Sequence, residues 1–434
     1  MQDSAANSAG GGMQDAVLSK VTWRLVPLLF FLYVVAYVDR INIGFAALQL
    51  QSRLGLSDAK YGFAAGVFFA GYVLFQVPSN LALERVGARR WIALLMIAWG
   101  IISSGMTLVK VPWHLYVLRF LLGAAEAGFF PGIIFYLRGW FPTSARARTV
   151  ACFAAAGPVA AIAGGPLSGA LLGIHWANLA GWQWMFLLES VPAVVLGIGV
   201  MLYLTNTPGE ARWLSSDERA WLLGSLLEEE KAPQPGTVAG FLAVLCSLPV
   251  WMMVCVYFGV NSSGYGITLW LPSLIRSLSG VSTLAIGLLS AIPYAAALIV
   301  MVLAGAHSDK SREYRWHITL PALLGAMALI SAGFSSSVTG LIAALSFAVV
   351  AQFSMVGPFW ALSTTIEPRH AATVIALINS LGNLGGLAGS YTIGALRNST
   401  AGFRNGLVVL GLGLGIAGCM ALAVPAQPQP LAGD

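Results

Sequence analysis

Five charged residues interrupt the apolar stretches of this 434-residue chain. Asp39 and Arg40 lie in YVVAYVDRINIGFAAL, Arg119 and Glu126 in LYVLRFLLGAAEAGFF, and Glu189 in GWQWMFLLES. A charge at the centre of a bilayer costs about 2.5–3.5 kcal/mol, so such residues are functional by default. An arginine fork binds a carboxylate or a sulfonate, and a buried acid can exchange a proton. The residues therefore predict anion binding and proton transfer inside an apolar medium.

The spacing of these charges limits which of them can act together. Arg119 and Glu126 are seven residues apart, which places them on one helix face about 10 Å apart along the axis. Asp39 and Arg40 are consecutive and point about 100° apart on a helix. One division of roles has Asp39 contacting the fourth helix and Arg40 facing a substrate path.

Simpler interpretations of these polar residues stay open. The charges can be inert ion pairs between helices, and for Glu189, beside Trp182 and Trp184, we favour that structural role. Asn379 and Asn383 stand one helical turn apart and can donate to a hydroxyl or a carboxylate, or hydrogen-bond between helices. Tyr37, Tyr72 and Trp360 can line a cavity or simply pack.

Long apolar runs must position these residues. The chain is 58% hydrophobic and 9% charged, unlike a soluble globular protein. A bilayer core needs roughly 20 apolar residues per helix, and a bundle of helices satisfies the backbone there. We expect an all-α membrane protein of about twelve helices: 24–48, 61–83, 91–110, 115–138, 149–172, 183–204, 241–275, 284–306, 317–335, 338–364, 371–396 and 405–425.

The longest polar break divides the spans into two halves. We expect a disordered N-terminal tail at 1–20, a six-helix bundle at 21–204 and a cytoplasmic central loop at 205–240. A second six-helix bundle follows at 241–425, with a C-terminal tail at 426–434. Lys and Arg gather in the loops on the side of the termini, which predicts that both termini are cytoplasmic.

A similar short loop follows the second helix of each half. NLALERVGARRW begins at Asn80 and GAHSDKSREYRW begins at Gly305, and each carries an acid followed by a base. Positive-inside charge alone can explain such loops. Equivalent positions in two repeats also predict a conformational latch, formed by Glu84, Arg85, Arg89, Asp309 and Lys310.

Six stretches together resemble one transporter family. FQVPSNLALERVGARRW, GAHSDKSREYRWH and ALINSLGNLGG join the three stretches that hold the charges. In this order they are similar to the anion:cation symporter family of the major facilitator superfamily, in particular its tartrate, 4-hydroxyphenylacetate and phthalate permease branch. The resemblance implies a twelve-helix fold with two halves related by a pseudo-twofold axis. It also implies proton-coupled import of a small organic anion by alternating access across a bacterial inner membrane.

The resemblance assigns a role to each candidate residue. It implies that Asp39 and Glu126 carry protons, that Arg40 contacts the substrate anion and that Arg119 tunes the acids. The positions that match lining residues of related sugar-acid transporters are Tyr37, Tyr72, Trp360 and Asn383.

Two positions depart from the family pattern. Gln76 stands where this branch often has a glutamate, which leaves the number of coupled protons open. The stretch AAAGPVAA around Pro158 lacks a polar amide that the sugar-acid transporters carry. We therefore expect a substrate with fewer hydroxyl groups than a sugar acid.

Other functions must be weighed against transport of an anion. A membrane sensor that binds an organic anion and a proton-driven efflux pump are the alternatives. The sequence shows no metal-ligand cluster, nucleophile elbow or phosphate loop, so we expect no enzyme, no metal and no cofactor other than the coupling proton. The expected partners are the anion, protons and the lipid bilayer, with no nucleic acid, and we expect a monomer.

Overall fold

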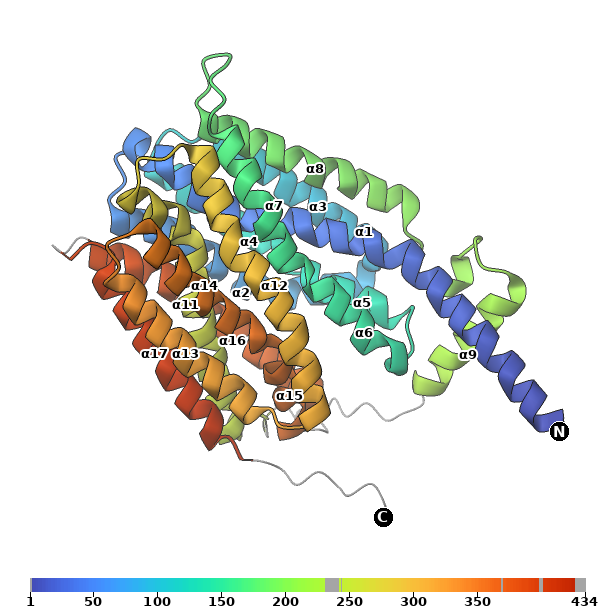
Figure 1. The fold of residues 1–434 in the computed structure, drawn as a ribbon. Coiled ribbons are helices and arrows are strands. Elements are labelled where there is room, and N and C mark those ends of the chain that lie inside the picture. The colour runs from blue at the N-terminus through green and yellow to red at the C-terminus, as the bar shows by residue number, and fades with distance from the viewer. Residues whose placement is uncertain (1, 231–241, 243, 368–369, 398–400, 426–434) are drawn as a thin grey trace.

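The computed structural model describes residues 2–230, 242, 244–367, 370–397 and 401–425, and these residues form a bundle of helices (Figure 1). The first half contains α1 (Gln2–Leu54), α2 (Asp58–Val86), α3 (Ala88–Gly105), α4 (Pro112–Glu126), α5 (Phe129–Arg138), α6 (Thr143–Ala154), α7 (Ala156–Leu171) and α8 (Gly181–Tyr203). After the connecting helix α9 (Ser216–Glu230), the second half contains α11 (Leu248–Leu278), α12 (Thr283–Ser311), α13 (Arg315–Gly333), α14 (Val338–Ser354), α15 (Val356–Ile366), α16 (Ala371–Arg397) and α17 (Arg404–Ala423).

These helices make twelve membrane-crossing segments. Among the described residues, ten helical segments are long and apolar enough to cross a bilayer, including α4 with α5 and α14 with α15 as single spans. The other two are α11 and α16, with 31 and 27 residues. Both exceed the roughly 20 residues that a bilayer core requires. Polar residues such as Asn261 and Asn383 lower their hydropathy. The expected all-α, twelve-helix architecture is confirmed.

The expected disordered N-terminal tail is wrong for the described residues. Helix α1 begins at Gln2 and continues into the membrane without a break. Val17 has no exposed surface, and α1 contacts α9. Lys20 Nζ also pairs with Glu218 Oε2 on α9 at 2.8 Å. The apolar contact and the ion pair explain why helix replaces the tail. The expected C-terminal tail, 426–434, lies outside the described residues.

The two halves meet at the end of the bundle opposite the start of α1, which we call the distal end (Figure 1). There α2 packs on α16 and α7 packs on α12. A Cβ atom at Gly62 would lie 2.5 Å from the Ser390 carbonyl oxygen, and one at Gly165 would lie 2.8 Å from that of Gly287. Small residues therefore allow the backbones to touch. Arg397 Nη1 adds an ion pair to Asp58 Oδ1 at 2.9 Å.

Candidate functional site

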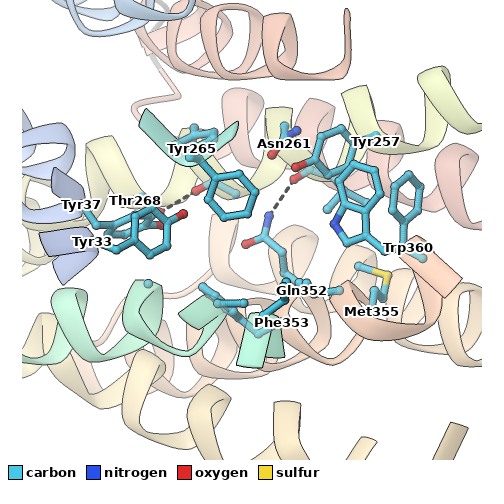
Figure 2. A pocket seen from close by; sticks show the side chains of 18 residues that line it. Tyr33, Tyr37, Tyr257, Asn261, Tyr265, Thr268, Gln352, Phe353, Met355 and Trp360 are labelled. Carbon is cyan, nitrogen blue, oxygen red and sulfur yellow. Dashed lines mark hydrogen bonds between the residues drawn. The ribbon is translucent and has the colours of Figure 1, made fainter. Parts of the chain in front are cut away.

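A cavity of about 250 Å³ lies between the two halves (Figure 2). Its walls come from α1, α5, α6 and α7 of the first half and from α11, α14 and α15 of the second. Tyr37 precedes the distal contact at Gly44 on α1, and Thr268 precedes the one at Leu269 on α11. The cavity therefore lies between the closed distal end and the end of the bundle at which α1 begins.

Aromatic rings dominate the cavity wall. They supply eight of the eighteen lining residues, so a bound molecule would meet mainly flat apolar surfaces. These rings belong to Tyr33, Tyr37, Phe130, Tyr257, Tyr265, Phe353, Phe359 and Trp360. Figure 2 shows Tyr33 and Tyr37 on one side of the cavity and Tyr257 and Trp360 on the other.

A few uncharged polar groups stand among the rings. Gln352 donates from Nε2 to the Val260 carbonyl at 2.6 Å, and Asn261 donates from Nδ2 to the Gly382 carbonyl at 3.3 Å. Thr268 donates to the Gly264 carbonyl at 2.8 Å. None of the described residues that line the cavity is charged. This wall can orient a ligand through hydrogen bonds, whereas the charged groups lie deeper.

Arg40 lies directly behind this wall. Its Nη2 and Nε atoms donate to Glu126 Oε2 at 2.8 and 3.2 Å, and its Nη1 donates to the Tyr265 hydroxyl at 3.2 Å. The guanidinium also lies 5.2 Å from the Phe68 ring centroid and 5.3 Å from that of Tyr72. Because Tyr265 lines the cavity, one tyrosine side chain separates the cavity from a buried ion pair.

One part of the division of roles that we expected is wrong: among the described residues, Asp39 makes no hydrogen bond to the fourth membrane span. Arg40, and not Asp39, contacts the fourth membrane span, through Glu126 at the end of α4. Asp39 instead accepts hydrogen bonds from Ser103 of α3 at 2.9 Å and from Asn42 at 3.5 Å. The 100° between consecutive residues separates the two side chains as expected, and the rotation of α1 turns Arg40 toward the fourth span and Asp39 toward α3.

Arg119 is fully buried and makes few polar contacts. Its Nη2 donates to the Ala65 carbonyl at 3.1 Å, while Nε and Nη1 have no hydrogen-bond partner. Among the described residues it forms no ion pair with Glu126. The Phe68 ring faces both arginines, with the Arg119 guanidinium 5.0 Å from its centroid. Arg119 can act on the acids only through the electric field of its charge.

Of the other predicted binding residues, Tyr37 and Trp360 line the cavity. Tyr72 is buried against Arg40. Asn383 donates to the Asn379 carbonyl at 2.7 Å and also to the Asn379 side-chain oxygen. The two asparagines thus bind each other and do not line the cavity in this conformation.

The predicted latch residues do not pair with one another among the described side chains. Glu84, Arg85 and Lys310 are exposed, and Arg89 donates to the Met201 carbonyl at 2.8 Å. The side chain of Asp309 lies outside the described part of the structure. The latch stays a prediction for another conformation.

Sequence reasoning missed most of the lining on the second half, above all Tyr265 and Gln352. Gln352 interrupts the apolar run FAVVAQF of α14, and Tyr265 follows the polar stretch NSSG in α11. The only feature of the sequence that could have indicated these two lining residues is a polar side chain in an otherwise apolar span. The same signal marks many residues that only join helices, so it does not single these two out.

Comparison with known proteins decides the family. The sequence pattern of the Major Facilitator Superfamily matches residues 29–390. The chain belongs to this superfamily. With a "Putative tartrate transporter" of Agrobacterium vitis it shares 45% identity, covering 91% of each chain. With the "Putative metabolite transport protein NicT" of Pseudomonas putida it shares 42% identity, covering 95% of each chain.

One further relative and one solved structure are similar to this major facilitator. A "Quinolone resistance transporter" of Acinetobacter baumannii is 39% identical, over 91% of this chain and 92% of the relative. The crystal structure of a bacterial homologue of the lysosomal transporter Spinster superposes with a TM-score of 0.76 at 20% identity, over 94% of this chain and 97% of the other. The chain is therefore a membrane transporter and not an enzyme, and its cavity lies where transporter repeats form their substrate sites.

Proposed function

We propose that the protein imports a small organic anion, a carboxylate or a sulfonate, together with protons. The observation that carries this proposal is the buried ion pair between Arg40 and Glu126 beside the cavity, with two donor distances of 2.8 and 3.2 Å. Both donors converge on Glu126 Oε2 and leave Oε1 without a partner, so the guanidinium holds this carboxylate by one oxygen and is suited to bind the carboxylate of another molecule. The carboxylate of a substrate can therefore replace that of Glu126.

A proton makes this replacement favourable. While Glu126 is ionised, its carboxylate occupies the Arg40 guanidinium. A substrate anion beside this carboxylate would be repelled by its negative charge. When Glu126 binds a proton, its hold on the guanidinium weakens and Arg40 becomes available to the substrate anion. Breaking a buried pair without a new partner leaves an uncompensated charge and costs about 3–5 kcal/mol. The cycle avoids this cost because the proton and the anion arrive together.

Tyr265 links this exchange to movement of the halves. Its hydroxyl accepts from Arg40 of the first half, while its own helix, α11, belongs to the second half. Its ring lies 4.3 Å from that of Phe69 on α2. A substrate anion that reaches Arg40 must displace the tyrosine hydroxyl, and this changes a contact between the halves. Binding and alternating access are thereby coupled.

The cavity wall favours an anion with a flat or weakly hydrated body. Aromatic carboxylates suit the rings, and the uncharged amides of Asn261 and Gln352 can bind one or two hydroxyl groups. Tartrate-like acids, which the name of one relative suggests, and sulfoacetate-like sulfonates are further candidates. The excess of Lys and Arg on the side of the termini supports a bacterial inner-membrane orientation with both termini cytoplasmic and the cavity facing inward.

Proton uptake into proteoliposomes tests the proposal. Purified protein is reconstituted with an internal pH dye, and candidate carboxylates and sulfonates are added outside one at a time. We expect one of the anions to acidify the interior and Glu126→Gln to abolish this signal while anion-for-anion exchange continues. If no anion moves protons although one of them shifts the melting temperature, symport is contradicted.

Proton-driven efflux is the second candidate. The aromatic wall and the relative named for quinolone resistance favour it. The two functions differ in direction, so cells that express the protein separate them. Import predicts growth on the anion as carbon source, whereas efflux predicts reduced sensitivity to an aromatic acid drug.

A further inference from the structure

A second polar cluster lies inside the first half and takes no part in the cavity wall. It contains Asp39 and Asn42 of α1, Ser103 of α3, Ser168 of α7 and Glu189 of α8. Asp39, Asn42 and Ser168 have no exposed surface, Ser103 is 1% exposed and Glu189 is 4% exposed. Burial of this many polar groups is costly unless they satisfy each other.

Hydrogen bonds tie each acid of the cluster to a serine. Ser103 donates to Asp39 Oδ1 at 2.9 Å, and Ser168 donates to Glu189 Oε1 at 2.7 Å. Asn42 stands between the two acids. Its Nδ2 donates to Asp39 Oδ1 at 3.5 Å, and its side chain also interacts with the Glu189 carboxyl.

Three oxygen atoms of the cluster have no hydrogen-bond partner. They are Asp39 Oδ2, Asn42 Oδ1 and Glu189 Oε2. An unsatisfied buried polar atom costs about 1–3 kcal/mol. A proton on Glu189 Oε2 would turn that atom into a hydrogen-bond donor, and the Asn42 side chain, which interacts with the Glu189 carboxyl, has an acceptor without a partner in Oδ1.

The balance of buried charge also calls for a proton. Within the membrane part of the first half, the guanidiniums of Arg40 and Arg119 face the three carboxyls of Asp39, Glu126 and Glu189. Arg40 holds Glu126 directly. Among the helices that pack on α8, α1 presents Asn42 to Glu189 and α7 presents Ser168, whereas Ser103 of α3 binds Asp39. Neither Glu189 nor Asp39 has a cation in hydrogen-bond contact among the described residues, so these two carboxyls share the one negative charge that the guanidiniums do not balance.

We propose that Glu189 holds a resident proton in this conformation and exchanges it with Asp39, with Asn42 positioning the two carboxyls. In the exchange the O–H bond at Glu189 Oε2 breaks and one forms at Asp39 Oδ2. Glu189 becomes the carboxylate, Asp39 becomes neutral, and the net charge of the cluster does not change. The inference rests on the proposed proton coupling and replaces the inert role that we favoured for Glu189.

Infrared spectroscopy of the purified protein tests the resident proton without any substrate. At neutral pH we expect the carbonyl-stretch band of a protonated carboxyl in the parent protein and in Glu228→Gln, an exposed glutamate of α9 used as control. We expect the band to disappear in Glu189→Gln. A band that survives in Glu189→Gln, or that is absent from the parent because a cation balances the charge, would overturn the proposal.

Transport separates a proton relay from a merely structural hydrogen bond. Glu189→Gln keeps the size and the hydrogen bonds of the side chain but cannot release a proton. We expect it and Asn42→Leu to slow substrate-driven proton uptake by about a hundredfold, the scale of a lost acid–base group, and to slow anion exchange much less. Glu189→Asp should restore part of the rate. Proton uptake by Glu189→Gln at the parent rate would show that the role is structural.

The two proposals fail in different ways. If no anion drives proton uptake in the parent protein, proton symport is wrong, whereas the infrared band still reports on Glu189. If the parent takes up protons with its anion and the band does not depend on Glu189, symport stands and the relay is wrong.

Discussion

The two halves of the transporter share a helical plan but differ sharply in chemistry. The buried charged side chains of the described residues, Asp39, Arg40, Arg119, Glu126 and Glu189, all belong to the first half. The second half supplies two thirds of the cavity lining, all of it uncharged. In the mechanism that we propose, proton chemistry is therefore confined to one six-helix body, and contact with the uncharged part of the substrate falls mainly to the other.

This asymmetry has a mechanical consequence. Protons can rearrange within the first half without changing the charge of the second. Among the described residues, the polar contacts between the halves include the one from Arg40 to Tyr265 near the cavity, the one from Ser380 to Gln76, and the ion pair of Arg397 with Asp58 at the distal end. A substitution at one of these contacts should therefore test the link between the halves, and a substitution inside one half should test the role of that half.

The largest effect is expected for Arg40→Ala. Truncating one partner of a buried, hydrogen-bonded charge pair costs about 2–5 kcal/mol, so uptake and anion exchange should fall together by about a hundredfold. Arg40→Lys, which keeps the charge but loses the fork, should be intermediate. Anion binding is measured by calorimetry. Parent-like affinity in Arg40→Ala would show that the substrate does not use this arginine.

A smaller effect is expected at the distal contact. In Gly62→Ala the new Cβ would lie 2.5 Å from the Ser390 carbonyl oxygen, and such overpacking costs about 1–3 kcal/mol. The closed distal end should therefore open more often. Spin labels on the exposed residues Arg53 and Gly280 should report a longer distance. Gly199→Ala, in which the new Cβ meets no atom within 4 Å, is the matched control. Equal distances in both variants would show that the contact at Gly62 does not keep the distal end closed.

Tyr265→Phe should have a modest effect. It removes the hydroxyl that accepts from Arg40 at 3.2 Å but keeps the ring against Phe69. A hydrogen bond of this kind contributes about 0.5–1.5 kcal/mol, so KM should change by up to about tenfold. Uptake kinetics measure this, with the exposed Tyr391→Phe as control. An unchanged KM and exchange rate would remove Tyr265 from the link between the halves.

The smallest effect is expected for Lys20→Ala on the connecting helix. The hydrogen bond from Lys20 lowers the pKa of Glu218, so this pair stabilises the fold above the ordinary carboxyl pKa and the gain is lost as the pH falls through the lowered value. An exposed pair contributes about 0–1 kcal/mol. Melting temperatures should therefore differ slightly at neutral pH and converge in acid. A difference that persists in acid would point to another cause.

The helices could be predicted from the sequence because the bilayer sets their length. The predicted 61–83 corresponds to α2 at Asp58–Val86, and the predicted 405–425 corresponds to α17 at Arg404–Ala423. The N-terminal helix was missed because its contact with α9 joins segments far apart in the chain. A hydropathy pattern indicates a membrane-spanning segment but does not indicate a contact between distant segments of the chain.

The site was only partly predictable, for a geometric reason. The buried charges stand out because few residues of that kind occur inside a membrane. Which neighbour each one meets depends on the rotation of α1, which the sequence does not show, and so the contact with the fourth span was assigned to Asp39 and not to Arg40. Tyr257 and Tyr265 look in the sequence like any packing aromatic, because only the packed bundle shows which rings face the cavity.

The most direct test of this division of labour is the number of protons taken up per anion, measured in one proteoliposome preparation with a pH dye and a labelled anion. Glu126→Gln of the first half should lower this ratio toward zero. Trp360→Ala of the second half should change which anion is preferred and leave the ratio as in the parent. A changed ratio in Trp360→Ala, or an unchanged one in Glu126→Gln, would contradict the account.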